Sequence, residues 1–365
     1  MKRLFTTTAV FIVPILFWVI LEGLLPSYAF TYRPWEALDF QTVFHLDRTF
    51  HPNTVLRMKS VGQLCHHTEY AVAHEEIWIT DELGNRNNTF IKDPDILIIG
   101  DSFAAGCAVT QDSVIANMLY AELDGKMKIY SIAPAEFSEL DYYLKSNTIA
   151  KPKIVVYLKS ERYVPRPMKY YRKPSGLKSA IKAKIKDNLL FSYLSIFLDK
   201  SLRHYSKNWV RARLSNQKGD GIAGIEGSNM FFFNEGNYSH DVNMVHDITN
   251  DLKRTKDNIV SYKEYCDSLG IEFIFIPMPN KATVYYELVP YKEQPGYIIK
   301  LDSMLQAENV KTINSLTLYN DYRKSDDELL YHLDDTHWNA KAISIVAEEI
   351  AKTITPSSRN YLDRE

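Results

Sequence analysis

Five short apolar runs recur along the chain, and stretches of helical periodicity lie between several of them. The runs span residues 96–99, 127–132, 154–158, 271–276 and 310–313. Strands that are buried on both faces of a parallel sheet have this continuously apolar character. Amphipathic stretches at 113–123, 247–269 and 339–354 have the spacing of helices that cover such a sheet. The pattern predicts an α/β fold, a flavodoxin-like, doubly wound parallel sheet with both faces covered.

The spacing of these elements also predicts the organisation of the chain. The sheet pattern occupies residues 91–357 and is interrupted once, by an insertion at 165–240. Residues 31–90 show no clear periodicity, and we expect an irregular segment that packs on the sheet. Residues 1–30 form a separate N-terminal segment.

The N-terminal segment has the features of a signal anchor. Lys2 and Arg3 precede an uncharged run from Leu4 to Leu21, which has about the length of one bilayer span. The basic pair would stay in the cytoplasm, so we expect a single-pass protein of the inner membrane with its catalytic domain in the periplasm. The small residues of Ser27-Tyr28-Ala29 leave an alternative, secretion to the periplasm after signal cleavage.

Charge is distributed unevenly. The whole chain has a formal net charge of −2, so its electrostatics do not favour nucleic acid as a partner. Between residues 166 and 218, however, there are 14 Lys or Arg and only two acids, Asp187 and Asp199. Within this part, 178–186 is predicted to be a basic helical face and 189–198 an apolar one. Three interpretations of the basic insertion follow. It forms a solvated helix, it forms a helix that lies on a membrane surface, or it presents a basic face to an acidic polymer or partner.

Two polar motifs stand near the ends of the sheet pattern. Ser102 follows the first apolar run in the sequence Gly-Asp-Ser-Phe, and His337 lies in Asp-Asp-Thr-His-Trp-Asn. A serine on a turn, a histidine and a carboxylate are the three parts of a hydrolase triad. We expect Ser102 as the nucleophile, His337 as the base, and Asp335 as its orienting carboxylate, with Asp334 as the alternative. The sequence thus predicts acyl transfer or ester hydrolysis that needs no metal and no cofactor.

The two motifs resemble the first and last blocks of the SGNH (GDSL) hydrolase superfamily. The form Asp-Thr-His-Trp is similar to the periplasmic polysaccharide O-acetyltransferases of the alginate type, and so is the Pro-rich stretch 277–285. The order of the motifs differs, because in the alginate enzymes the Asp-x-His element precedes the serine. The resemblance implies an SGNH-like sheet with Ser102 at the end of its first strand.

The resemblance also implies an oxyanion hole and a substrate-side lysine. SGNH enzymes supply a Gly after the second strand and an Asn after the third. Here the corresponding positions are filled by Ala135, which would have to donate its backbone N–H, and by the stretch that contains Arg162, which would offer a charged donor. Lys281 corresponds to a substrate or scaffold residue.

Together these features predict a periplasm-facing enzyme that transfers acetyl groups onto the hydroxyls of an exopolysaccharide. The implied partners are the polysaccharide acceptor and an integral membrane acyltransferase that donates acetyl. The same triad with water as acceptor would be a carbohydrate esterase or deacetylase. A third possibility is a non-catalytic subunit of polysaccharide assembly.

Overall fold

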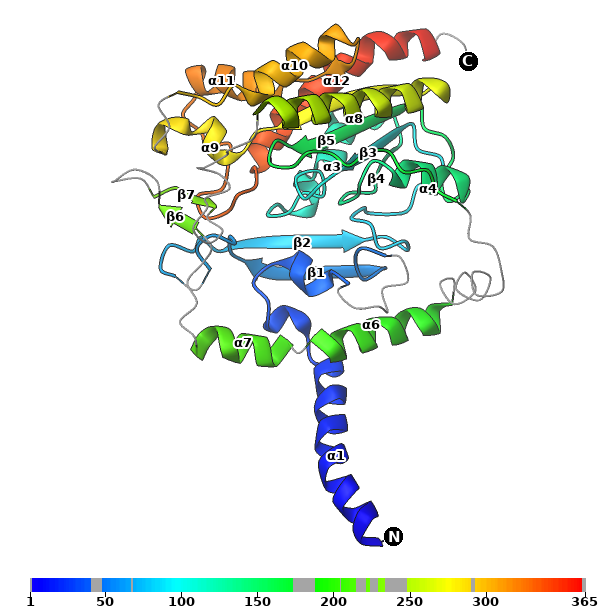
Figure 1. Ribbon diagram of the computed structural model, residues 1–365, viewed down its shortest axis with the longest axis vertical. Helices are drawn as coiled ribbons and strands as arrows, with labels where there is room; N and C mark the ends of the chain where they lie inside the picture. The colour runs from blue at the N-terminus through cyan, green and yellow to red at the C-terminus, as the bar shows by residue number, and fades with distance from the viewer. Residues whose placement is uncertain are drawn as a thin grey trace.

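A computed structural model describes residues 2–40, 48–66, 68–172, 188–203, 205–214, 221–223, 229–233, 248–289 and 293–362. In Figure 1 a helix-covered sheet forms the upper part of the molecule, and a two-stranded sheet lies beneath it. Two helices, α6 and α7, lie across the base, and the N-terminal helix α1 runs away from the body at that base.

The main sheet has five parallel strands in the order β4-β3-β5-β8-β9. Their bounds are Ile96–Gly100 for β3, Ile129–Ser131 for β4, Ile154–Ser160 for β5, Glu272–Met278 for β8 and Lys311–Thr312 for β9. All five predicted strands are confirmed. From β3 the chain moves to one side to form β4 and then crosses to the other side to form β5, so the strand order reverses at β3. Open α/β sheets bind their ligands at such a reversal, outside the carboxyl ends of the strands.

Helices such as α3, α8 and α12 cover this sheet, while α1, α6 and α7 lie at the base of the molecule (Figure 1). The bounds of the helices are Lys2–Leu24 (α1), Pro34–Leu38 (α2), Ile115–Glu122 (α3), Glu139–Lys145 (α4), Leu189–Arg203 (α6), Tyr205–Leu214 (α7), Ile248–Ser268 (α8), Lys281–Val284 (α9), Tyr297–Ala307 (α10), Ser315–Ser325 (α11) and Ala340–Leu362 (α12). The periodic stretches at 113–123, 247–269 and 339–354 correspond to α3, α8 and α12. Helices α3 and α12 pack against each other, while α8 packs against β8 and α10.

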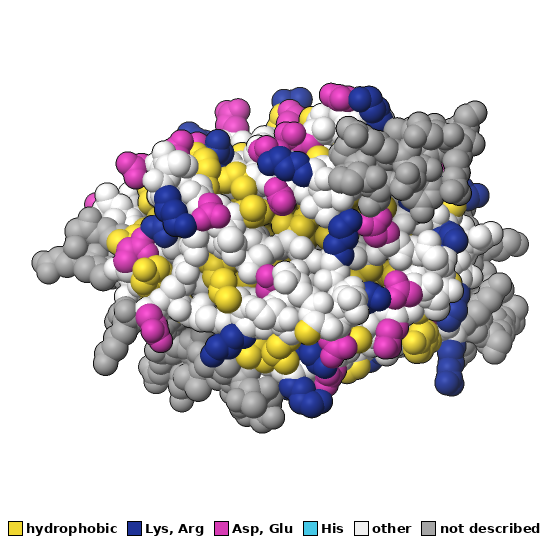
Figure 2. Space-filling view, turned by 90° about the horizontal axis from the view of Figure 1, so that it is seen from above, with side chains coloured by type: hydrophobic (Ala, Val, Ile, Leu, Met, Phe, Trp, Pro, Cys, Tyr) yellow, Lys and Arg dark blue, Asp and Glu magenta, His cyan; other side chains and the backbone are white. Residues whose placement is uncertain are grey.

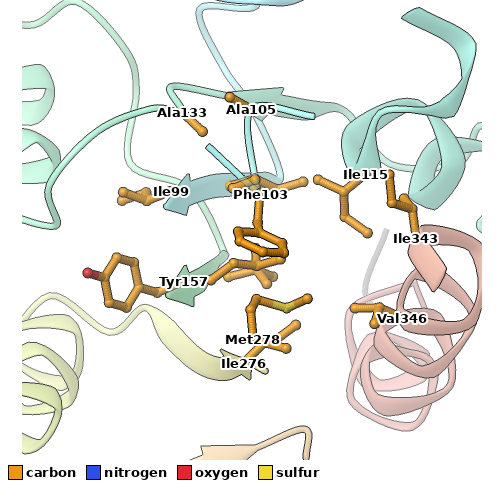
Figure 3. Packing of buried hydrophobic residues seen from close by; sticks show 14 of the residues in the cluster. Ile99, Phe103, Ala105, Ile115, Ala133, Tyr157, Ile276, Met278, Ile343 and Val346 are labelled. Atoms are coloured by element: carbon orange, nitrogen blue, oxygen red, sulfur yellow. The ribbon is translucent and has the colours of Figure 1, made fainter. Parts of the chain in front are cut away.

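The core lies between the sheet and its helices. Ile99 of β3, Ile115 of α3 and Ile343 of α12 are fully buried, and Figure 3 shows them around the ring of Phe103. Phe103 directly follows Ser102 in the chain and is itself 3% exposed. Burying such side chains stabilises the fold by about 1.5–3 kcal/mol each. The turn that carries Ser102 is therefore attached to the core by its next residue.

The expectation of an irregular segment at 31–90 is wrong in one respect. Strands β1 (Thr54–Ser60) and β2 (His74–Thr80) pair as an antiparallel two-stranded sheet. One face of each strand is buried, at Leu56 and Ser60 in β1 and at Glu76, Trp78 and Thr80 in β2. Three of these five buried residues are polar, so alternation of apolar and polar residues did not reveal the strands.

The insertion contains α6, α7 and a small antiparallel pair, β6 (Gly221–Ala223) and β7 (Phe231–Phe233). The basic stretch 178–186 lies outside the described residues. Residues 2–24 form the single helix α1. Within the part of the chain that the structure describes, no helix combines the length and the apolar character that crossing a membrane requires. The predicted N-terminal membrane anchor is thus without support from the structure.

Candidate active site

Ser102 stands on a tight turn at the carboxyl end of β3. The carboxylate of Asp101 fixes this turn, because it accepts hydrogen bonds from the backbone N–H of Phe103 (3.1 Å) and of Ser160 (2.9 Å). Gly100 ends the strand where a Cβ atom would lie 2.4 Å from the carbonyl oxygen of Leu158. Only glycine allows the two strands to approach this closely. The Gly-Asp-Ser sequence therefore builds the turn from its own residues and β5.

His337 and Asp335 lie in hydrogen-bond reach of Ser102. The His337 Nε2 atom is 2.9 Å from the Ser102 Oγ atom, and the His337 Nδ1 atom is 2.6 Å from the Asp335 Oδ1 atom. An ionised carboxylate only accepts hydrogen bonds, so Nδ1 carries the proton and Nε2 accepts from the serine hydroxyl. The predicted residues are thus brought together in the order Ser–His–Asp.

The environment of Asp335 keeps its carboxyl group ionised. Burial alone raises the pKa of Asp335, but the charge of His337 and its hydrogen bond to the carboxylate outweigh burial. The positive charge of Arg33 and a hydrogen bond from the Gln63 backbone N–H (2.9 Å) act in the same direction. The pKa of Asp335 consequently lies far below its usual range. A permanent negative charge at this position favours the imidazolium that forms when His337 takes a proton.

Asp334, the alternative orienting carboxylate, has another role. Its Oδ2 atom accepts hydrogen bonds from the backbone N–H groups of Gly62 (2.9 Å) and Val72 (2.8 Å). A Cβ atom at position 62 would lie 2.1 Å from the Asp334 carbonyl oxygen, so glycine is required there. Asp334 thus fastens the loop that carries His337 to the segment between β1 and β2.

Lys281 holds the same loop from the protein interior. Its side chain is fully buried, and its ammonium donates to the carbonyl oxygens of His332, Leu333 (2.9 Å) and Asp335 (3.0 Å). A lysine has three donors, and all three are used here. The substrate role considered for Lys281 is therefore wrong, and its scaffold role fits the structure.

The oxyanion prediction for Ala135 is also wrong in this arrangement. The Ala135 N–H donates to the carbonyl oxygen of Gly100 at 2.7 Å and so is not available to a developing oxyanion. The backbone N–H of Ser102 itself makes no hydrogen bond to any described residue, so it is a donor that a developing oxyanion at the nucleophile can use. Arg162 lines the same cleft as Ser102 and lies over the ring of Phe233 at 5.1 Å.

Ser102 and His337 open into a cleft of about 340 Å³ that Gln63, Arg162 and Phe233 also line. Next to it lies a larger groove of about 730 Å³, and Thr49 and Pro134 line both. The larger groove carries four tyrosines, at positions 142, 143, 170 and 171, and five charged side chains, those of Arg48, Glu136, Glu139, Arg166 and Lys169. Flat aromatic rings with nearby polar groups are suited to bind sugar rings.

Cys107 also lines the cleft but is not a second nucleophile. Burial raises the pKa of its thiol to about 12, so the reactive thiolate is scarce at neutral pH. Across the described residues, no group of three or more His, Cys, Asp or Glu side chains is arranged to hold a metal ion. The nucleophile available in the cleft is the hydroxyl of Ser102.

Two residues of the site could not be identified from the sequence. Gln63 donates its backbone N–H to Asp335, and its side chain joins Thr336 (2.7 Å) to Arg33 (2.6 Å). Arg33 also pairs with Glu36 at 2.6 Å. Both residues lie in a region without periodicity and far from either motif, so no local signal pointed to them.

Comparison with known proteins supports the predicted resemblance. Residues 232–365 match the family model described as the SGNH hydrolase-like domain of acetyltransferase AlgX. The chain resembles the SGNH acetyltransferases. The matched region contains Lys281, Asp335 and His337, while Ser102 precedes it. The resemblance supports an enzyme that transfers acyl groups or cleaves esters. No curated protein sequence matches the chain.

Solved structures of the GDSL type show remote similarity. They include a lipolytic protein of the G-D-S-L family from Veillonella parvula (11% identity, TM-score 0.37, covering 71% of this chain and 97% of that one). A second is a lipase/acylhydrolase from Enterococcus faecalis (12% identity, TM-score 0.36, covering 73% of this chain and 97% of that one). A third is the esterase EstA from Pseudoalteromonas (12% identity, TM-score 0.33, covering 75% of this chain and 100% of that one). A fold hosts many activities, so these similarities do not specify what this chain does.

Proposed function

We propose that this protein is an O-acyltransferase that moves acetyl groups onto polysaccharide hydroxyls through an acyl-enzyme at Ser102. The observation that carries the proposal is the hydrogen-bonded row Ser102–His337–Asp335 at the wall of a cleft that adjoins a larger, tyrosine-lined groove. The geometry fits nucleophilic catalysis, and the groove fits an acceptor much larger than water.

In the first step the Ser102 oxygen attacks the carbonyl carbon of an acetyl ester, and the His337 Nε2 atom takes the hydroxyl proton. Asp335 stabilises the resulting imidazolium. The Ser102 N–H and the Arg162 guanidinium are the donors proposed for the oxyanion. When the tetrahedral intermediate collapses, His337 gives its proton to the departing alcohol, and acetyl-Ser102 remains.

In the second step the acceptor is a sugar hydroxyl. His337, now neutral, takes the proton of this hydroxyl while its oxygen attacks the acetyl carbonyl. Collapse of the second intermediate releases the acetylated sugar, and His337 returns the proton to Ser102. If water occupies the acceptor position instead, the same steps produce acetate, and the enzyme is an esterase.

We further propose that this reaction takes place in the periplasm. The support is the Lys2-Arg3 pair before an uncharged run, which acts as an inner-membrane anchor or a cleaved signal. The acetyl donor would then be an integral membrane acyltransferase. The test joins a reporter enzyme after residue 365. The proposed location would be contradicted if a reporter that functions only in the cytoplasm were active in this fusion.

The catalytic proposal is tested with the full-length protein and a chromogenic acetyl ester, with and without an oligosaccharide acceptor. Ser102→Ala should abolish formation of a covalent acetyl-protein, detected by mass spectrometry, and reduce ester turnover by about 10⁵-fold or more. Ser303→Ala, at a surface serine of α10 that hydrogen-bonds only within its helix, is the matched control and should behave like the wild type. Undiminished turnover in folded Ser102→Ala would refute the proposed mechanism.

Acceptor use separates the two activities. Acetylated oligosaccharide in the presence of the acceptor supports transfer. Release of acetate alone, at the same rate with every neutral and acidic oligosaccharide tried, supports the esterase and contradicts the transferase.

A further inference from the structure

Helix α6 has its apolar face on the outside. Leu190, Phe191, Tyr193, Leu194 and Leu202 are all exposed, with Leu190 at 73% and Tyr193 at 67%. The residues that α6 buries are polar, namely Ser192, Ser195, Asp199 and Ser201. A surface helix of a globular protein has the opposite arrangement. An outward apolar face of this kind marks a site of interaction with a protein or a membrane.

Specific polar contacts fix this orientation. The Arg48 guanidinium donates to the Ser192 hydroxyl, and the Asp199 carboxylate lies 3.6 Å from the His51 ring nitrogen. Arg203, at the end of the helix, donates to the carbonyl oxygen of Asp39. Because these contacts join α6 to the segments on both sides of residues 41–47, the helix cannot rotate its apolar face inward without losing all of them.

Helix α1 extends the same apolar surface. Its side chains from Val10 to Leu21 are largely exposed and almost all apolar. The C-terminal end of α1 packs on α6, where Gly23 leaves no room for a Cβ atom beside Phe197 and Ser201. The carboxylate of Glu22 is buried and accepts a hydrogen bond from the Ser206 hydroxyl at the start of α7. In Figure 1, α1 leaves the body where α6 and α7 meet.

Helix α7 adds positive charge to this base. It exposes Lys207 and Arg211, and its sequence contains no acidic residue. The opposite face of the molecule, seen in Figure 2, carries acidic and basic side chains interspersed over its surface. Apolar and cationic side chains on helices that lie in one plane are typical of helices seated in the headgroup region of an anionic bilayer.

We propose that the exposed faces of α6 and α7 dock this protein onto an anionic lipid bilayer, with α1 as a second attachment to the same membrane. A second copy of the chain or a flat protein partner fits this base poorly, because α1 projects from the middle of it. A fluid bilayer accommodates both the projecting helix and the two helices in its surface. Since Arg48 both holds α6 and lines the tyrosine-bearing groove, docking would place that groove near the membrane surface.

The depth of α6 in the bilayer provides the first test. Full-length protein with Leu194→Cys is labelled with an environment-sensitive fluorophore and mixed with phosphatidylglycerol/phosphatidylcholine vesicles that contain nitroxide lipids. Cys65, Cys107 and Cys266 are buried, so labelling is directed to the new thiol. The matched control is Ile299→Cys, an exposed apolar position on α10 (45% exposed).

We expect severalfold stronger quenching at position 194 than at 299, and stronger quenching by nitroxides near the headgroup than by nitroxides at the chain end. Equal quenching at the two positions would overturn the proposal. The proposal would also be overturned if, without vesicles, the fluorescence of the label at position 194 changed with protein concentration. That result would show that a second copy of the chain binds the apolar face of α6. A 194 label quenched only when another membrane protein is present would assign the face to that protein.

The cationic part is tested by removing two charges. Lys207→Gln with Arg211→Gln should weaken binding to the anionic vesicles roughly 30-fold, at about 1 kcal/mol per cation, and leave binding to neutral vesicles unchanged. Lys126→Gln with Lys352→Gln removes two exposed cations elsewhere and is the control. Since α1 is the same in all variants, its contribution cancels. Equal affinity of both double variants for anionic vesicles would contradict the role given to α7.

Discussion

The two sides of the candidate active site are built in different ways. The serine side is local, because its turn is fixed by Asp101 and by the neighbouring strand β5. The histidine side depends on distant segments, since the loop 331–338 is fastened by Gly62, Gln63, Val72 and Lys281. A short motif can therefore specify the serine turn, while the position of His337 requires most of the chain to be folded. Changes on the histidine side should reduce stability as well as activity.

The adjacent carboxylates Asp334 and Asp335 offer the sharpest test of this difference. Asp335→Asn should lower kcat/KM for an acetyl ester by about 10⁴-fold, because the imidazole loses its orienting charge. Asp334→Asn should instead lower the free energy of unfolding by about 1–3 kcal/mol, as two charge-assisted hydrogen bonds weaken. Ester kinetics and urea unfolding of both variants measure the two effects. A larger loss of turnover in folded Asp334→Asn than in Asp335→Asn would reverse the assignment.

Lys281→Met should destabilise the histidine side strongly. Three backbone carbonyls would lose their donor inside the protein, and we expect a loss of roughly 3 kcal/mol or more in the free energy of unfolding. Lys324→Met is a suitable control, because Lys324 is exposed and pairs with Asp321 within α11, so it should contribute within about 1 kcal/mol. Urea unfolding of the two variants measures their free energies of unfolding. Equal losses in the free energy of unfolding for the two substitutions would show that the buried hydrogen bonds of Lys281 stabilise the fold no more than a surface ion pair does.

His332 makes the histidine side sensitive to acid. Burial lowers its pKa to about 4, and the charges of His74 and Lys281 lower it as well, against the opposing effect of Asp335 and Asp334. In the unfolded chain the pKa returns to about 6.5, so between these values the unfolded state binds more protons. Stability is therefore lost as the pH falls from about 6.5 to about 4, by up to about 1.4 kcal/mol per pH unit.

Urea unfolding at pH 6.5 and pH 5.5 measures this loss. Carboxylates elsewhere also contribute to the slope, so the comparison is between the wild type and His332→Gln, which should lose less stability over the same interval. An identical loss in the two proteins would exclude His332 as its source.

The parts of the fold predicted from sequence are those with strong local patterns. Five continuously apolar runs became the five strands, and Ser102, His337 and Asp335 came together because the carboxyl ends of β3 and the last loop share one edge of the sheet. Strands β1 and β2 were missed because their buried positions are largely polar. The scaffold role of Lys281 and the loss of Ala135 as a donor depend on which carbonyls lie nearby, and no sequence spacing encodes that. Likewise, the periodicity of α6 predicted an apolar face but not that it points outward.

The contact between Gly62 and Asp334 has a consequence for how this enzyme can be divided. The segment from Gly62 to Val72 provides backbone donors to both carboxylates before the main sheet has begun. A fragment that starts at β3 would keep all five strands and both motifs, yet it would leave the carboxylates of Asp334 and Asp335 without these backbone donors. The smallest part of the chain that could be catalytic is therefore larger than the main sheet, because it includes the segment from Gly62 to Val72. Grafting the serine and histidine motifs onto another sheet of this type would transfer the chemistry only if that short upstream segment were moved with them.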